Sequence, residues 1–438
     1  MKRFLIVIIL VMLGHLTSPH LKEAVAQDVT QLGGDLTTDL PGRFALQLPA
    51  PNISSEASRI RQLSGFAVFH KLFQRSDGLG PSFVNRSCGG CHVENGRGPT
   101  SFPRGKFEGS PMMIKVALRE RNADGSAKGV PGIGQQLQNH TVSGGERFDV
   151  SLRWLKVRGS YPDGKRYTLR RPRLTFRAKG FTQRKLRSSL RMSPILIGSG
   201  LLESVPESVV LEREDATDVD GDGISGRANY VPSRTDQKAL GRFGFKATHP
   251  TVKQQSAAAL FFDMGVTTKL FSGKGGHVEL PDDELDRLVV YQTLAGVPQS
   301  RNQIAPEVVA GKSLFFSAGC ESCHRINLRT ESSSAPELDG QTIHPFTDLL
   351  LHDMGPGLAD NHPEFLARGP EWRTAPLWGL GFSGTVSAVR PRYLHDGRAR
   401  SIEEAILWHG GEALASRNYF MALPLSERQK LLAFLSSL

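Results

Sequence analysis

Apolar residues recur with helical spacing in several stretches of this chain. Between Ser58 and Phe73 they return every three or four positions, which predicts an amphipathic helix. The same spacing occurs over 282–294 and at the end of the chain, where Ser426 to Gln429 have the pattern of a capping box. The last predicted helix carries Leu431, Leu432, Phe434 and Leu435.

Two of the helical stretches are alike. Gly65 precedes Phe69 by four residues, and Gly311 precedes Phe315 by the same spacing. Each stretch is followed by a Cys-x-x-Cys-His segment, and each half of the chain ends in another predicted helix. Turn-forming residues over 296–306 separate the two copies. This self-similarity predicts an internal repeat.

The first copy is longer than the second because of an insertion at about 104–190. Within it, two runs alternate apolar and polar residues on either side of the turn Pro162-Asp163-Gly164. The alternating apolar positions are Phe148, Val150, Leu152 and Trp154 in the first run and Tyr167 and Leu169 in the second. The pattern predicts a small antiparallel β-element.

The first 26 residues have the features of a secretory signal peptide. Met1-Lys2-Arg3 is basic, 4–13 is apolar, and Ala24-Val25-Ala26 offers a cleavage site before Gln27. The apolar run is shorter than the roughly 20 residues that a membrane-spanning helix requires; a buried core helix is the alternative. No later stretch is long and apolar enough to span a membrane, so we expect an exported, soluble protein in the periplasm.

All four cysteines belong to two motifs, Cys88-Gly89-Gly90-Cys91-His92 and Cys320-Glu321-Ser322-Cys323-His324. This pattern is the signature of covalent c-type haem attachment, in which two thiols bond the porphyrin vinyl groups and the His ligates the iron. One such motif would leave a redox cysteine pair, a zinc site or chance as alternatives. Two complete motifs with no thiol left over, more than 200 residues apart, predict two covalent haems.

These patterns together give the expected fold. We predict a mainly α protein with two cytochrome c-like domains and a small antiparallel β insertion in the first. The expected divisions are 27–56 as an extended N-terminal arm, 57–300 as the first domain and 301–438 as the second.

The chain is basic, with a formal net charge of +11. Loss of the predicted signal peptide would remove three cations and one anion and leave +9. Four haem propionates would offset roughly four of these charges. The remaining excess lies largely in 147–191, which includes Arg170-Arg171-Pro172-Arg173. Export argues against nucleic-acid binding, so we expect a solvated face or a docking surface for an acidic redox partner.

An acidic, glycine-rich segment resembles the first half of a calcium loop. Asp218, Asp220 and Asp222 occupy positions 1, 3 and 5, and the carbonyl of Ile224 is a further predicted ligand. Position 12 is Asn229 where an EF-hand has Glu, so an EF-hand is not expected. One calcium ion is predicted here, and an acidic surface turn is the alternative.

A short helix near the C-terminus places a histidine on its apolar face. Ser401 and Glu404 form a predicted capping box, and Gly410 follows the last helical turn. His409 shares one face with Ile402, Ala405 and Ile406. A buried histidine needs a partner, which is either an iron or a polar group of the core.

The C-terminal segments resemble the second half of bacterial dihaem cytochrome c peroxidases and the related dihaem enzyme that matures methylamine dehydrogenase. The resemblance lies in 373–378, in 393–398 and in 401–411. In those families an aromatic-x-His-[Asp/Ser]-Gly turn precedes the distal ligand of the second haem, which comes 14 residues after the turn histidine. Here His395 and His409 have that spacing. Relatives have Met or Tyr at this position. The resemblance therefore implies a second haem ligated by His324 and His409.

Most of 60–438 is similar to the dihaem oxidoreductase family that is often labelled thiol oxidoreductase. No cysteine is left for thiol chemistry, so the label is not adopted. The segments that carry this resemblance are Asp218–Asn229, Gly241–Ala247, Leu349–Gly355 and Glu371–Gly379.

The resemblance implies a periplasmic dihaem c-type oxidoreductase of the peroxidase-like kind, whose first haem, on His92, reacts with a small molecule such as peroxide. The second haem would relay electrons from a small redox donor protein. The alternative is a non-enzymatic dihaem electron-transfer cytochrome with both irons closed. Neither a nucleic acid nor a membrane span is expected, and the oligomeric state is open.

A peroxidase site also needs a distal acid or base. Glu203, in the segment 193–203 that replaces the distal segment of the peroxidases, is the predicted catalytic residue, and a helix-start or surface carboxylate is the alternative. The residues that would instead close the first haem are Met112, Met113 and His140.

Trp378 and Trp408 lie in the segments that match the relatives, where a tryptophan bridges the two haems; either could equally be a core residue. His352 and His395 each precede an aspartate, and a hydrogen-bonded turn is the favoured interpretation of both.

Overall fold

The structure is a computed structural model that describes residues 27–100, 107, 110–142, 148–177, 180–233, 238–331, 335–386 and 390–438. The predicted signal peptide, 1–26, lies outside the described residues. Within these ranges no helix has both the length and the apolar character needed to cross a membrane.

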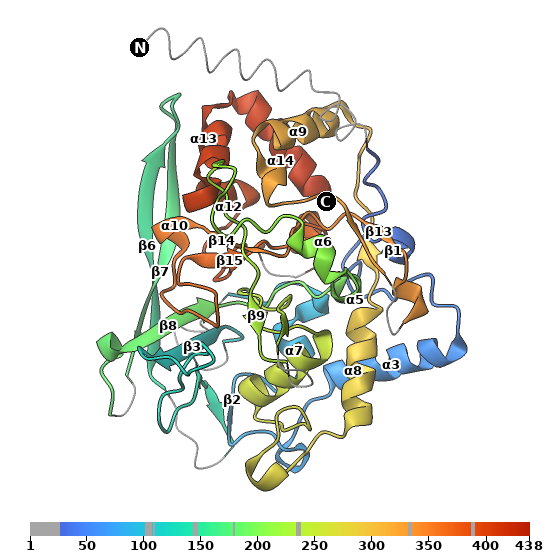
Figure 1. Ribbon diagram of the computed structural model, residues 1–438, viewed down its shortest axis with the longest axis vertical. Helices are drawn as coiled ribbons and strands as arrows, with labels where there is room; N and C mark the ends of the chain where they lie inside the picture. The colour runs from blue at the N-terminus through green and yellow to red at the C-terminus, as the bar shows by residue number, and fades with distance from the viewer. Residues whose placement is uncertain are drawn as a thin grey trace.

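Two helix pairs form the framework of the molecule. In the first pair α3 (Glu56–His70) packs on α8 (Asp282–Thr293), and in the second α9 (Pro306–Ser317) packs on α14 (Leu425–Ser437). Figure 1 shows the first pair at the lower end of the molecule and the second at the upper end. The predicted helices are present, and the first ends at His70.

Both pairs cross at a glycine. A Cβ atom on Gly65 would lie 2.0 Å from the carbonyl oxygen of Arg287, and one on Gly311 would lie 2.0 Å from that of Lys430. No side chain fits at either crossing, because the backbones of the paired helices touch there. This is the physical reason for the glycine in each copy of the repeat.

The repeated phenylalanines serve the same contacts. The ring centroids of Phe69 and Tyr291 are 5.0 Å apart in the first pair, and those of Phe315 and Phe434 are 5.5 Å apart in the second. Each glycine-and-phenylalanine face therefore packs on the closing helix of its own half.

The remaining α-helices are short, and along the chain four lie between α3 and α8 and four between α9 and α14. They are α4 (Cys88–Cys91), α5 (Ser199–Glu203), α6 (Glu207–Leu211), α7 (Val252–Ala259), α10 (Gly355–Leu358), α11 (Ser383–Val386), α12 (Ile402–Leu407) and α13 (Leu414–Ala422).

Several small sheets are distributed along the chain. The strands are β1 (Thr37–Thr38), β2 (Ser82–Phe83), β3 (Met113–Leu118), β4 (Gln136–Leu137), β5 (His140–Thr141), β6 (Val150–Ser160), β7 (Arg166–Phe176), β8 (Leu186–Arg191), β9 (Tyr230–Val231), β10 (Ala239–Leu240), β11 (Val297–Pro298), β12 (Leu328–Arg329), β13 (Thr342–Ile343), β14 (Leu351–Asp353) and β15 (Glu371–Arg373). One sheet has the strand order β4-β3-β8, and the others are pairs.

The predicted β-hairpin is present as β6 and β7, which pair over eleven positions. It runs along the left side of the molecule in Figure 1. At its base Val150 and Phe176 pack with the β3 and β8 strands, whereas Tyr161 and Leu169 near its tip pack in the core that contains α14. The hairpin thus joins the insertion to the second half of the chain.

The N-terminal arm is not loosely attached. Val29, Leu32 and Leu36 are fully buried in the main core, and β1 pairs with β11. Although the arm has little regular structure, as predicted from its lack of periodicity, its apolar side chains make it part of the core.

Two predictions about the fold were wrong. The chain is not mainly α: it is 33% helical and 19% strand, with 12 helices in the described part and several small sheets, which is a mixed composition. Helical periodicity located the long helices but carried no information on two- and three-residue strands. The capping box at Ser426 is also absent, because α14 begins at Leu425 after Pro424 and has no side-chain cap.

The glycine crossing of the second pair can be tested by substitution. We expect Gly311→Ala to destabilise the protein by about 1–3 kcal/mol, because its new methyl group would force α9 away from α14. Thermal unfolding should show a lower melting temperature. Gly384→Ala is the matched control, since its Cβ would lie 3.7 Å from the nearest atom. Equal melting temperatures for the two variants would contradict the crossing.

Candidate functional site

The second Cys-x-x-Cys-His motif follows α9 directly and lines a cavity. Cys320, Cys323 and His324 lie on its wall, which is mostly apolar. The Nδ1 of His324 lies 2.9 Å from the carbonyl oxygen of Phe346. Desolvation lowers the pKa of His324 to about 4, so its imidazole is neutral, with Nδ1–H donating to the carbonyl.

His409 lies on the wall of the same cavity, after the end of α12. Its Nδ1 lies 2.8 Å from the carbonyl oxygen of Ala405, and desolvation lowers its pKa. The predicted helix and its cap are present, since the side chain of Ser401 accepts a hydrogen bond from the amide of Glu404. The structure therefore brings together His324 and His409, which are far apart in sequence.

The donor set of this cavity fits a c-type haem. In both histidines Nδ1 is held by a backbone carbonyl, and Nε2 has no hydrogen-bond partner among the described residues. This second-sphere arrangement is the usual one for metal-ligating histidines. The cavity measures about 210 Å³ and has the two thiols at its wall.

One wall of the cavity is a stack of aromatic rings. The rings of His395 and Trp372 are 3.8 Å apart and nearly parallel, at 9°. On Trp372 also lies the ammonium group of the fully buried Lys246, 4.4 Å from the ring centroid, and Lys246 pairs with Asp360 at 3.1 Å. His395 is 3.4 Å from Asp396. The geometry gives His395 a packing role in the wall.

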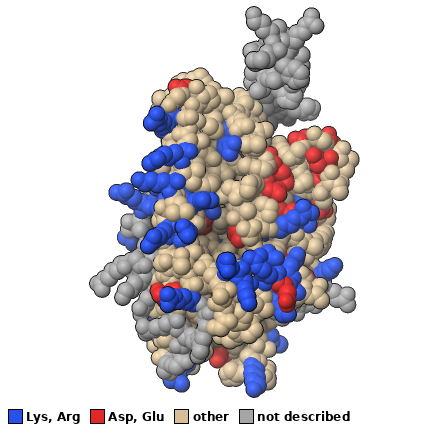
Figure 2. Space-filling model, turned by 90° about the vertical axis from the view of Figure 1, so that its left-hand side faces the viewer, with Lys and Arg blue, Asp and Glu red and all other residues tan. Residues whose placement is uncertain are grey.

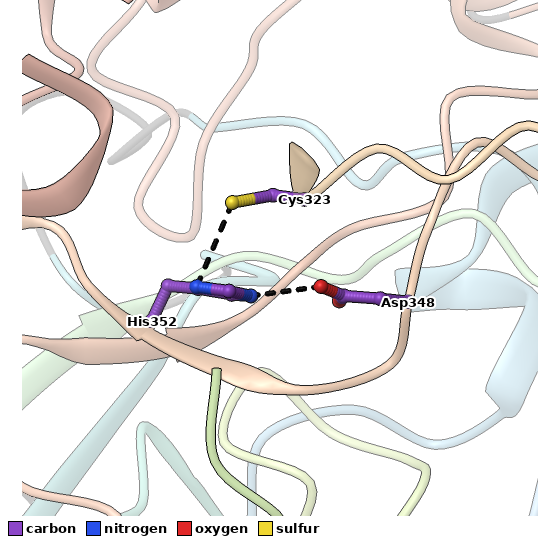
Figure 3. A group of neighbouring side chains, drawn as sticks. All are labelled: Cys323, Asp348 and His352. Carbon is purple, nitrogen blue, oxygen red and sulfur yellow. Dashed lines mark hydrogen bonds and ion pairs between the residues drawn. The ribbon is translucent and has the colours of Figure 1, made fainter. Parts of the chain in front are cut away.

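His352 lies beside the second motif, and Figure 3 shows its ring between Cys323 and Asp348. A second carboxylate, that of Glu412, also contacts the ring. Its Nε2 is 2.8 Å from Asp348, its Nδ1 is 2.6 Å from Glu412, and the Sγ of Cys323 is 3.5 Å from Nδ1. Burial alone would lower the pKa of His352, but the hydrogen bonds to these groups raise it well above 6.5. Both ring nitrogens are thus engaged, and His352 is an imidazolium clamped at the edge of the cavity.

The histidine of the first motif is held in the same way, although its motif forms a short α-helix where the second forms a 3-10 turn. Ser87 caps α4 by accepting a hydrogen bond from the amide of Gly90, and His92 follows the helix. The Nδ1 of His92 lies 2.9 Å from the carbonyl oxygen of Pro194, and desolvation lowers its pKa to about 4. His92 is therefore a third neutral histidine held at Nδ1, with Nε2 unpaired among the described residues.

A carboxyl group that the sequence did not single out lies near the first motif. Desolvation raises the pKa of Asp263 to about 6. A hydrogen bond of 2.7 Å from the side-chain amide of Gln136 acts in the opposite direction and lowers it, but by less. Burial, and next the charge of Asp263, raise the pKa of the Cys88 and Cys91 thiols. Asp263 belongs to no sequence motif, so its position near Cys88 and Cys91 could be found only from the structure.

Glu203, the predicted distal acid, is the last residue of α5 and is bonded to the start of α7. Its carboxylate accepts a hydrogen bond of 2.5 Å from the amide of Val252 at the start of α7, and the charge of Arg242 acts on it. Desolvation raises its pKa. Among the described residues no hydrogen bond or ion pair joins Glu203 to either motif.

The three side chains considered as closing ligands of the first haem lie in different surroundings. Met112 is fully buried in the core of the β3–β8 sheet, and Met113 begins β3. His140 lies on β5, stacked on Phe83 at 5.2 Å, and Phe83 belongs to the cluster that contacts Cys88. Of the three, His140 is the one with a neighbour in that cluster.

The acidic segment brings three carboxylates together. Oxygens of Asp215, Asp218 and Asp220 lie within 4.8 Å of one another, whereas Asp222 accepts a hydrogen bond from the amide of Ile224. Asp215 was missed because it precedes the calcium-loop pattern. Ile224, at the end of this acidic loop, lines the cavity that contains the second motif.

Trp378 lies where the surroundings of the two motifs meet. A Cβ on Gly198, four residues after Pro194, would lie 2.2 Å from its ring, and its neighbour Leu377 lines the cavity. Trp408 instead lies under the guanidinium of Arg398, at 4.7 Å.

Fold and site define a protein with two histidine-containing motifs, each suited to a haem. A family model described as "Di-haem oxidoreductase, putative peroxidase" matches residues 123–275 and 272–438, well over half of the chain. The chain belongs to this family of dihaem oxidoreductases, whose description implies two haem groups. Neither the curated proteins nor the solved structures gave a match.

The clamp around His352 predicts a pH-dependent contribution to stability. Because its pKa is raised in the folded state, the contribution is complete below about 6.5, the ordinary pKa, and is lost as the pH rises through the folded value. The melting temperature of His352→Gln should therefore fall furthest below that of the wild type at acidic pH, with a gap that shrinks as pH rises.

Melting curves across a pH series measure this gap. His277→Gln is the control, since His277 is 67% exposed and 3.6 Å from Glu279. A gap that widens with rising pH would show that His352 is neutral in the fold.

Proposed function

We propose that the protein is an exported, periplasmic dihaem c-type oxidoreductase of the peroxidase type. Cys88 and Cys91 would bond one haem, and Cys320 and Cys323 the other. The observation that carries the proposal is the set of three neutral histidines held at Nδ1, of which His324 and His409 share one cavity.

The two haems would have different roles. His324 and His409 line one cavity and would both hold the second haem, which would suit it to electron transfer. His92 would hold the first haem, which would then be the one to react with a small molecule such as peroxide. A haem supplies the redox chemistry when bound, and the residues of the chain bind it, exclude water and move protons.

Asp263 is better suited than Glu203 to move a proton at the first site. The Glu203 carboxylate already accepts a hydrogen bond from the start of α7 and lies under the charge of Arg242. Asp263 acts electrostatically on both thiols of the first motif and has a pKa of about 6. Such a carboxyl group can take a proton from one peroxide oxygen and return it to the other near neutral pH.

Trp378 is suited to carry electrons between the two sites. It touches the loop that follows the carbonyl partner of His92, and it adjoins the wall of the second cavity. We assign the bridging role to Trp378 and a packing role to Trp408.

A small acidic redox protein would dock on the hairpin formed by β6 and β7. Six cations of its two strands are exposed and have no ion-pair partner among the described residues. They are Arg153, Lys156, Arg158, Arg166, Arg171 and Arg173. Figure 2 shows basic side chains gathered on the side of the molecule along which the hairpin runs. Near its tip the hairpin contacts α12, which leads to His409, since Tyr161 donates to Glu403 at 2.6 Å.

One calcium ion would bind the acidic loop. Asp215, Asp218 and Asp220 offer the oxygen ligands that calcium prefers, in place of the set Asp218, Asp220, Asp222 and Ile224 read from the pattern. Because Ser225 donates to Glu412 at 2.7 Å, an ion there would also stiffen the clamp around His352.

The alternative function is electron transfer by two haems that leave no room for a substrate. It would require His140 to hold the first iron as well, and the Nε2 of His140 has no hydrogen-bond partner among the described residues. The oxidised spectrum separates the two. For the peroxidase we expect a high-spin ferric component that shifts with cyanide and a low-spin component from the second haem. Two low-spin haems that ignore both cyanide and peroxide would favour the electron carrier.

The same spectrum tests His409. In His409→Ala the low-spin signal of the second haem should become high-spin or weakly ligated, because the variant lacks a histidine that would hold the iron. An unchanged low-spin signal would mean that another residue ligates the second iron.

The proton-transfer role of Asp263 predicts a pH dependence. The deprotonated carboxylate accepts the peroxide proton, so the rate of reaction with peroxide should rise as the pH increases through about 6 and then level off. Asp263→Asn should lower the rate by about 100-fold or more and abolish the rise. Stopped-flow spectroscopy measures both.

Glu203→Gln is the paired variant for this experiment. It should keep the rise near pH 6, even where the lost contact to α7 lowers stability. If the rise disappears in Glu203→Gln and persists in Asp263→Asn, the assignment of Asp263 is wrong.

A further inference from the structure

An arginine from the loop of the first motif reaches the cavity of the second. Arg97 follows His92 by five residues and lines the cavity that contains His324 and His409. Its Nη1 donates one long hydrogen bond, 3.4 Å, to the carbonyl oxygen of Leu394. Its Nε is buried without a hydrogen-bond partner, and no carboxylate pairs with it among the described residues.

The other two arginines of the cavity wall have other surroundings. Arg373 donates from Nε to Gly244 at 3.2 Å and from Nη1 to Thr374 at 3.1 Å, and the charge of Asp348 acts on it. The amide of Asp348 in turn bonds to the carbonyl of Cys323, which places Arg373 on the thiol side of the cavity.

Arg417 has an unpaired Nε like Arg97, but its Nη2 donates to the exposed side chain of Asn418 at 3.2 Å. The charge of Arg417 also acts on His409. The side chain of Arg97, by contrast, has the uncharged residues Leu394 and Tyr393 as its partners.

A guanidinium in this position needs an anion. Burying a cation without a counter-charge is costly. The Nε of Arg97 has no partner and no carboxylate among the described residues pairs with its guanidinium, in line with the lowering of its pKa by desolvation. A carboxylate is the anion that the planar fork of arginine binds best, through two parallel hydrogen bonds. The only carboxylates that would enter an apolar cavity with a haem are the propionates of that haem.

We propose that Arg97 binds a propionate of the second haem and so places a residue of the first motif's loop in the second haem's site. The proposal rests on the proposed function, since it requires the haem on Cys320 and Cys323. A fixed positive charge beside a haem favours its reduced state, so Arg97 would raise the reduction potential of the relay haem. The shared chemistry, a carboxylate, could also come from a free anion in solution.

The test is a redox titration of the holoprotein that follows the low-spin signal of the second haem. Arg97→Gln should lower the reduction equilibrium constant at least tenfold, which is about 59 mV for a one-electron couple. Arg97→Lys keeps the charge and should recover more than half of the shift. Arg417→Gln, at the same cavity, should shift the equilibrium less than Arg97→Gln.

Titration of the wild type with acetate separates the two sources of the carboxylate. A propionate partner leaves the potential independent of acetate, whereas a free anion at Arg97 makes it vary with concentration and overturns the proposal. A shift in Arg97→Gln no larger than that in Arg417→Gln also overturns it. The mass of the protein distinguishes either result from failure of the proposed function, because without thioether-bound haem the mass is that of the bare polypeptide.

Discussion

The structure depends on neutral imidazoles whose Nδ1 is held by a backbone carbonyl. A histidine oriented in this way presents Nε2 in one direction, so the position of the carbonyl fixes where an iron can be. For His324 the carbonyl belongs to Phe346, a residue with a positive φ of 56°. Such a backbone conformation costs about 1–3 kcal/mol unless the surroundings hold it. The ring of Phe346 packs on Phe315 and Phe434, at 5.9 Å from each, which ties the ligand to the α9–α14 pair.

That constraint explains why the two helix pairs are built alike. A carbonyl can fix a ring only if the elements on both sides of it are rigid, and direct contact of backbones at Gly65 and Gly311 leaves little freedom between the paired helices. The two halves then differ in what surrounds this common frame. The first half carries the β-rich insertion, and the hairpin of that insertion packs into the core of the second half at Tyr161.

The sequence was sufficient for the parts that repeat or have a local signature. The long helices and the hairpin follow from spacing, and the face of a short helix placed His409 with Ile402, Ala405 and Ile406, which all line one cavity. The mixed composition could not be foreseen, because strands of two or three residues have no period. Asp263 and Arg97 also escaped notice, since their importance comes from residues more than 100 positions away, such as Gln136 for the first and Leu394 for the second.

The two sites are less separate than the two motifs suggest. The loop that begins at His92 ends at Arg97 in the wall of the second cavity, and Trp378 packs on Gly198, near the carbonyl that holds His92. A movement of the 92–97 loop would therefore change the orientation of one ligand and the charge beside the other site together. Because only a few covalently linked residues separate His92 from Arg97, the two sites share one short segment of the chain.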